Sequence, residues 1–173
     1  FNTSLPVMAE ENDHANTVME RVMVIGSADR AQDLTGSAQF IDNETLDQNN
    51  YTDINRVLRQ VPGVNIQEEE GYGNRPNIGL RGGRSERSAD ITLMEDGILI
   101  APAPYAAPSA YYFPRVNRME AVEVRKGSST IKFGPRTTSG AVNLISSSVP
   151  SEQEIEALVG YGTENTRRLQ GHY

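Results

Sequence analysis

Short apolar runs, separated by glycines and polar turns, make up most of the hydrophobic pattern along this chain. They predict strands over residues 37–41, 64–66, 77–81, 90–94, 98–100, 119–124, 130–133 and 140–145. Asp96-Gly97 is a tight-turn signal for a hairpin, and Gly127 separates two further strands that we expect to pair. The apolar run 21–25 predicts one more strand, or an extended segment that awaits a partner strand.

Helical periodicity is clearest at one place. The apolar residues that recur at helical spacing are Ile54, Val57, Leu58 and Val61. Thr52 or Asp53 supplies the amino-terminal cap, and Pro62-Gly63 ends the helix. Asp42 or Asn43 predicts the cap of a short helical turn nearby. A helix followed by a run of strands indicates an α+β domain.

The amino-terminal part differs from this pattern. Residues 1–9 resemble the end of a secretory signal peptide, with 7–9 as a loose cleavage site, although a disordered leader has the same appearance. Residues 10–36 are mostly small, polar and acidic, which predicts a flexible arm. The packed domain is then expected to span residues 37–150.

Composition excludes several classes of function. The 173 residues include no cysteine, and the two histidines, His14 and His172, lie near opposite ends of the chain. A Cys/His metal site, a serine–histidine triad or a thiol nucleophile therefore has little to be built from. A net charge of −7 argues against nucleic-acid binding. Residues 127–130 after Lys126 weakly resemble a phosphate loop, but the lysine precedes the glycine and no helix is predicted to follow. We therefore predict that the chain is not an enzyme and holds no resident metal or cofactor.

Five motifs in sequence order resemble a known family. They are DINRVLRQVPGVNI, NIGLRGG, ITLMEDGILI, MEAVEVRKGSSTIKFGP and SGAVNLIS. Together they are similar to the plug domain of TonB-dependent outer-membrane receptors, most of all to the ferric citrate receptor branch, over about residues 20–150. The resemblance implies a mixed four-stranded sheet with short helices, held inside a β-barrel of the outer membrane. Residues 151–173 then look like the first strands of a truncated barrel, with a turn at 162–165.

The family resemblance also implies a partner, the energy-coupling protein TonB. TonB pairs edge to edge with a short extended segment of the receptor, the TonB box. The best candidate here consists of Glu20, Arg21, Val22, Met23 and Val24. Residues 17–19 are a second option, and 21–25 could instead be the first strand of the plug.

On the outer side, the resemblance implies loops that contact a transported ferric chelate, a siderophore or a ferric carboxylate. The candidate ligand-binding residues are Arg84, Ser85, Arg87, Ser88, Tyr105, Tyr111 and Tyr112. Guanidinium and hydroxyl donors suit an anionic, oxygen-rich ligand. The alternative is that the arginines are solvated beside Glu86 and Asp90 and that the tyrosines serve packing. The ferric citrate branch tends to place a glutamine near Ala107 and an arginine near Glu86, and their absence argues against citrate as the ligand.

Two cations match positions that in the family pair with carboxylates of the barrel wall. They are Arg81 and Lys126, with Arg125 beside the latter. Such pairs predict a latch between plug and barrel. A stand-alone periplasmic binding or interaction module with the same fold is the alternative function.

Overall fold

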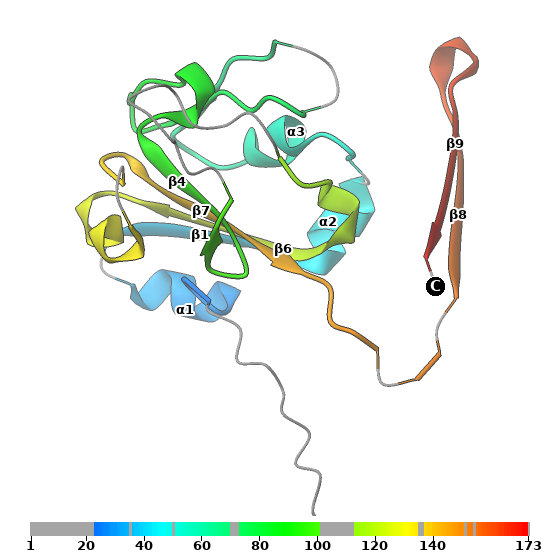
Figure 1. Cartoon of the computed structure of the whole chain (residues 1–173), viewed down its shortest axis with the longest axis horizontal. Coiled ribbons are helices and arrows are strands. Elements are labelled where there is room, and N and C mark those ends of the chain that lie inside the picture. The colour runs from blue at the N-terminus through cyan, green and yellow to red at the C-terminus, as the bar shows by residue number, and fades with distance from the viewer. Residues whose placement is uncertain are drawn as a thin grey trace, which may run out of the picture.

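The computed structural model describes residues 23–34, 36–49, 51–69, 73–100, 113–134, 137–150, 152–153 and 155–172. In this part of the chain a mixed sheet forms the centre. The helix α1 (Ala28–Asp33) lies on one side of the sheet, and α3 (Ile54–Leu58) lies on the other (Figure 1). None of the described helices is long and apolar enough to cross a membrane.

The central sheet has the strand order β1-β6-β7-β4-β5. These strands are β1 (Ser37–Ile41), β4 (Ile91–Glu95), β5 (Ile98–Leu99), β6 (Met119–Lys126) and β7 (Gly140–Ser146). β6 is antiparallel to β1 and β7, whereas β7 and β4 are parallel. The predicted α+β class and mixed sheet are confirmed. The sheet has five strands rather than the expected four, because short strands pair at both of its edges.

Alternation along β6 creates two different faces of this sheet. Val122 and Val124 point to one face and join a large apolar cluster, which we call the apolar face. Glu123 and Arg125 point to the opposite face, which we call the polar face. All four side chains are buried, so both faces of the strand are covered.

The apolar face holds the main core. Its cluster includes Leu46, Ile54, Leu58, Leu93 and Leu144, which come from helices and strands far apart in the sequence. Leu46 lies in α2 (Asn43–Asn49). This continuous cluster is the main source of stability, because burial of apolar surface dominates folding.

The predicted cap of α3 is confirmed. The Asp53 carboxylate accepts a hydrogen bond of 2.8 Å from the backbone N–H of Asn55. The helix is shorter than its apolar spacing suggested, because the chain turns after Leu58 and Val61 N–H donates to the Leu58 carbonyl. At α2, Asp42 accepts from the N–H and the hydroxyl of Thr45, and the hydroxyl contact is the main cause that lowers the pKa of Asp42.

The predicted hairpin after residue 90 is also confirmed. β4 and β5 pair across Asp96 and Gly97, both of which have positive φ, +49° and +81°. This is the backbone of the tight hairpin turn that an Asp-Gly pair favours. The Asp96 carboxylate also accepts bonds of 3.0 Å and 2.5 Å from the Ser146 N–H and hydroxyl, which fixes the turn to β7.

Two small two-stranded sheets complete the fold. β2 (Val64–Ile66) pairs with β3 (Ile78–Leu80), and β8 (Glu156–Tyr161) pairs with β9 (Arg167–His172). The second pair lies apart from the central sheet (Figure 1). Its two strands and the turn between them follow the prediction, with a 3-10 turn, η4 (Thr163–Asn165), at the connection. The remaining 3-10 turns are η1 (Glu86–Ser88), η2 (Val116–Arg118) and η3 (Ser128–Phe133).

The predicted strand over 130–133 is wrong, because these residues form η3. The Thr130 hydroxyl contacts the carbonyls of Gly127 and Thr137, at 2.7 Å and 3.0 Å, and this ties the segment into a loop. β6 therefore pairs with β1 and β7 instead of with this segment.

The amino-terminal predictions also need correction. The described part of the run 21–25 is not a strand, because its amides bond to a side chain rather than to a neighbouring strand. Within the predicted flexible arm, residues 28–33 form α1, and the Ser27 hydroxyl caps it by accepting from Arg30 N–H at 3.3 Å. The helix has an amino-terminal cap, and the apolar residues Ala31 and Leu34 pack against a cluster that includes Met94 and Ala141 of the sheet.

Candidate functional site

The most unusual contacts in the described chain surround the carboxylate of Glu123. This side chain is fully buried in the middle of the central sheet. Its oxygens accept hydrogen bonds from three consecutive backbone N–H groups, those of Val24, Ile25 and Gly26, at 2.7, 2.9 and 2.7 Å. We call these three contacts the clasp. A buried carboxylate is tolerated when several donors surround it, and here the donors belong to a segment about 100 positions away.

A fourth donor comes from the neighbouring strand. Asn143 lies opposite Glu123 in the register of β6 and β7, and its Nδ2 donates to Glu123 Oε2 at 2.8 Å. The carbonyl oxygen of the same side chain accepts from Gly97 N–H at 2.9 Å. The side-chain amide of Asn143 thus connects the clasp with the hairpin turn between β4 and β5.

Residues 23–34 lie over the polar face, and we call them the cover segment. Its buried apolar members Val24 and Ile25 cluster with Met94 and Ala141 of the sheet. Half-buried residues around this cluster are Ala31, Leu34, Ala38, Phe40 and Phe133. This cluster is much smaller than the core of the apolar face. The cover segment therefore depends more on the hydrogen bonds of the clasp than the apolar face depends on its hydrogen bonds.

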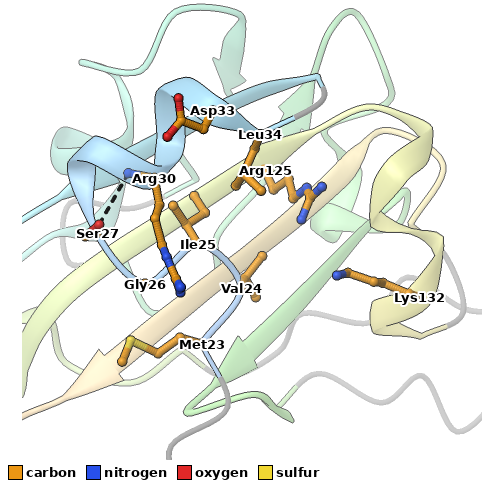
Figure 2. A pocket seen from close by; sticks show the side chains of 10 residues that line it. All are labelled: Met23, Val24, Ile25, Gly26, Ser27, Arg30, Asp33, Leu34, Arg125 and Lys132. Atoms are coloured by element: carbon orange, nitrogen blue, oxygen red, sulfur yellow. Dashed lines mark hydrogen bonds between the residues drawn. The ribbon is translucent and has the colours of Figure 1, made fainter.

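A cavity of about 720 Å³ lies between the cover segment and the sheet (Figure 2). Three cations line it, namely Arg30, Arg125 and Lys132. Arg125 and Lys132 also lie over the ring of Phe133, at 5.8 Å and 4.9 Å from its centroid. Among the described residues no group accepts a hydrogen bond from Arg125 Nε, although that atom is buried.

The structure divides the predicted TonB box. Glu20, Arg21 and Val22 lie outside the described residues, as does the second option, 17–19. Met23 is 50% exposed, whereas Val24 is only 7% exposed and takes part in the clasp. The boundary between accessible and held backbone therefore falls inside the predicted box.

The predicted ligand residues between 84 and 88 have different environments. Arg84 has a 75% exposed side chain and pairs with Asp90, its Nε and Nη2 at 3.1 Å and 2.9 Å from the carboxylate. This contact raises the pKa of Arg84. Ser85 and Ser88 are buried, and their hydroxyls donate to the Gln67 side chain and to the Pro76 carbonyl.

Arg87 and Ser88 have a backbone conformation that is rare for residues with side chains. Their φ angles are +45° and +54°. The N–H of Arg87 donates to the Asn77 side chain at 2.6 Å, which holds this conformation in place. Tyr105, Tyr111 and Tyr112, the other predicted ligand residues, lie outside the described residues.

The two predicted latch cations lie close to each other. Lys126 is buried, and its Nζ donates to the Pro62 carbonyl at 2.6 Å. Burial, and secondly the positive charge of Arg81, lower the pKa of Lys126. Arg81 Nη1 also lies 2.8 Å from the position that a Cβ on residue 127 would take, and the φ of +101° at Gly127 favours glycine there. No metal-binding group of three or more acidic, histidine or cysteine side chains occurs among the described residues.

Sequence reasoning missed Glu123 and Asn143. A signal was present, because Glu123 is a charged residue between Val122 and Val124 at a central position of a predicted strand. The amides that would satisfy it lie about 100 residues away, and no local pattern indicates them.

Comparison with known proteins identifies the fold family. A sequence model described as the TonB-dependent receptor plug domain matches residues 30–141. The vitamin B12 transporter BtuB of Vibrio vulnificus is 24% identical over 87% of this chain, and the match covers 25% of that protein. The probable TonB-dependent siderophore receptor PiuA of Acinetobacter baumannii is 31% identical over 79% of this chain and 17% of its own length.

Solved structures agree with this assignment. The unliganded ferric citrate transporter FecA superposes with a TM-score of 0.67 and 28% identity, over 77% of this chain and 21% of that protein. The ferric-catecholate import receptor Fiu of E. coli shares the fold, with a TM-score of 0.56, 24% identity and coverage of 79% of this chain and 18% of that protein. This chain therefore spans a quarter or less of the proteins that it matches here.

Proposed function

This chain belongs to the plug-domain family of TonB-dependent receptors, and we propose that it is the plug of an outer-membrane importer of a ferric chelate. The family match over residues 30–141 carries the proposal. Relatives named as a siderophore receptor and a ferric citrate transporter support a chelate, a siderophore or a ferric carboxylate, as the cargo. The proposed role is transport and gating, without catalysis.

The cargo is tested on the full-length receptor. Cells that express it are incubated with radiolabelled ferric siderophores, ferric citrate and vitamin B12, because one relative is named as a vitamin B12 transporter. We expect saturable binding of a ferric chelate. Binding of vitamin B12 alone would contradict the proposed cargo while leaving the receptor assignment intact.

We propose that the loop 82–89 contributes to the ligand surface. Arg84 is exposed, and the strained backbone at 87 and 88 is the kind of feature that clusters at ligand sites. Arg84→Ala in the full-length receptor is expected to weaken chelate binding at least about fivefold, the loss of one charge-assisted contact. Arg118→Ala is the matched control, since Arg118 is also ion-paired, with Glu95 on β4. Equal binding by both variants would exclude Arg84 from the site.

We propose that residues 20–24 are the TonB box and that the arm before them lies in the periplasm. The support is the position of Val24, the last residue of this segment, which lies against the sheet at the clasp. Deletion of residues 17–25 from the full-length receptor is expected to abolish energised uptake and to spare ligand binding. Uptake that survives the deletion would place the box elsewhere.

We propose that Arg81 and Lys126 pair with carboxylates of the surrounding barrel wall. Two neighbouring cations, one of them buried, favour an anionic partner. Arg81→Gln is expected to lower the unfolding temperature of the full-length receptor and to leave that of this chain alone unchanged. An equal effect on both proteins would contradict the latch.

We propose that residues 151–173 begin the barrel and that the plug includes the cover segment as well as residues 37–150. The hairpin of β8 and β9 supports the first part, because Val159 and its partner Leu169 are 79% and 82% exposed and form an outward apolar surface. The sequence has no cysteine. Val159→Cys in the full-length receptor is therefore expected to react with a lipid-soluble maleimide, and reaction only with a water-soluble reagent would contradict this assignment.

A stand-alone periplasmic binding module is the second candidate. The five-stranded sheet of this chain favours it, because all of its strand pairings are made between residues of this chain. If this chain alone binds a ferric chelate more tightly than about 1 mM, the second candidate gains support.

A further inference from the structure

The clasp holds part of the segment that the proposed partner must bind. Val24 is the last residue of the proposed TonB box, and its N–H donates to Glu123. Met23, one position earlier, is half exposed. Val24 is therefore not available to a partner strand while the clasp is closed.

Strand pairing and the clasp compete for the same backbone. A partner strand that pairs edge to edge lies about 4.8 Å away and takes alternate N–H groups of the segment into its own ladder. The Val24 N–H cannot remain on Glu123 and also donate in such a ladder. A strand whose register takes the Val24 N–H must therefore remove Val24 from the clasp, and in either register it must lift Val24 off the sheet to reach it, because Val24 is only 7% exposed.

Loss of Val24 weakens the remaining contacts. The amides of Ile25 and Gly26 share one oxygen of Glu123, Oε1, and belong to the same short segment. Only a small apolar cluster holds this segment on the sheet. Once one end is pulled away, water can reach the carboxylate and replace the other donors, so the three contacts are expected to open together.

We propose that Glu123 is a positioning residue that couples partner binding to release of the cover segment from the polar face. With the clasp closed, the cover segment stays on β6, a central strand of the sheet. Pairing of residues 20–24 with the TonB strand opens the clasp. By thermodynamic linkage, any change that opens the clasp also strengthens partner binding. This inference rests on the proposed TonB coupling.

The test uses this full chain, a Glu123→Gln variant and a matched Glu120→Gln control. Glu120 lies on the same strand but is exposed, so the control makes the same chemical change outside the clasp. Amide hydrogen exchange is measured by NMR at Val24, Ile25 and Gly26. We expect exchange at least about tenfold faster in Glu123→Gln, because charge-assisted bonds are lost, and no change in the control. If Glu123→Gln does not fold, the Val24→Pro variant is used instead. It removes one clasp donor and changes only the cover segment, and the exchange rates of Ile25 and Gly26 are then expected to rise.

Partner binding is measured on the same proteins by titration calorimetry with the periplasmic domain of TonB. Glu123→Gln alone opens the clasp, whereas Glu123→Gln combined with Val22→Ala also weakens the box. Comparison of the two variants separates the effect of the clasp from the effect of the box. We expect Glu123→Gln to bind at least about threefold more tightly than the wild type, and the added Val22→Ala change to reverse that gain. In the wild type, bound TonB should speed exchange at Gly26.

The two measurements separate the possible failures. Unchanged exchange in both Glu123→Gln and Val24→Pro would overturn the clasp. Faster exchange together with equal TonB affinity for wild type and variant would overturn the linkage. Faster exchange with no TonB binding to either protein would overturn the proposed coupling function, and with it the linkage, while the clasp would stand.

Discussion

The two faces of the central sheet are closed in different ways. On the apolar face, a continuous cluster from α2, α3 and several strands buries large side chains such as Leu58 and Leu93. On the polar face, the short cover segment lies over a carboxylate and a small apolar cluster. The same strand, β6, contributes to both faces through alternate side chains.

This difference separates the stability of the whole domain from the release of the cover segment. A large apolar core opens only when the whole domain unfolds, because its contacts are shared among many elements. A cover of few contacts opens by itself at a lower free energy. A plug that transmits a pull without losing its fold, as we propose for this chain, needs both kinds of closure, and the two faces supply one each.

The largest expected effect comes from replacing one buried isoleucine by alanine on each face. Ile54 and Ile25 are 1% and 4% exposed, so both are buried to the same degree. Ile54→Ala is expected to lower the free energy of global unfolding by about 2–5 kcal/mol, the usual cost of such a core deletion. Ile25→Ala is expected to cost less than about 2 kcal/mol, because its effect cannot exceed the free energy that closes the cover segment. Urea denaturation of this chain measures both values.

Equal losses for the two variants would break the comparison. They would mean that the cover segment unfolds together with the core. The Leu99→Ala change provides a baseline, since Leu99 lies on an edge strand and is 40% exposed.

Removal of a helix cap on each face is expected to give a smaller loss of unfolding free energy, again larger on the apolar face. Asp53 caps α3 on the apolar face at 2.8 Å, whereas Ser27 caps α1 in the cover segment at 3.3 Å. Asp53→Ala is expected to lower the free energy of unfolding by about 1 kcal/mol. Ser27→Ala is expected to lower it by no more than about 0.5 kcal/mol, for the reason given for Ile25. Thermal denaturation followed by circular dichroism compares them, and a larger loss for Ser27→Ala would contradict the account.

The smallest expected effect is the pH dependence that Lys126 adds. Its pKa in the folded chain is lowered, mainly by burial, so the folded state disfavours the charged amine. Between that lowered pKa and the ordinary lysine pKa near 10.5, the unfolded chain binds more protons. Stability that Lys126 contributes therefore rises as pH rises through this window. We expect the unfolding free energy of the wild type, relative to Lys126→Gln, to rise toward pH 10.5, and a fall would contradict the burial of the amine.

Much of the apolar side of the fold was predictable from the sequence. The α3 cap at Asp53, the hairpin turn at Asp96-Gly97 and β7 follow from local periodicity and turn chemistry, which the sequence displays directly. The additional edge pairing was not predicted, because it depends on contacts between distant segments. The 3-10 turn at 128–133 was not predicted, because its short apolar run has the composition of a strand, and the Thr130 hydroxyl contacts that tie it into a loop have no apolar signal.

The candidate site was less predictable than the fold. The exposure of Arg84 and the proximity of Arg81 and Lys126 were accessible through family resemblance, and their roles remain predictions. The clasp was not accessible, since the amides of Val24 to Gly26 carry no side-chain signal and their partner, Glu123, is about 100 residues away.

The most direct test of the difference between the two faces is native-state hydrogen exchange of this chain at increasing urea concentrations below the unfolding transition. We predict that the amides of Val24, Ile25 and Gly26 exchange through a local opening, with a lower free energy and a weaker urea dependence than the amides of Val122 and Val142. If all five amides exchange with the free energy and urea dependence of global unfolding, the cover segment is part of the core and the account is wrong.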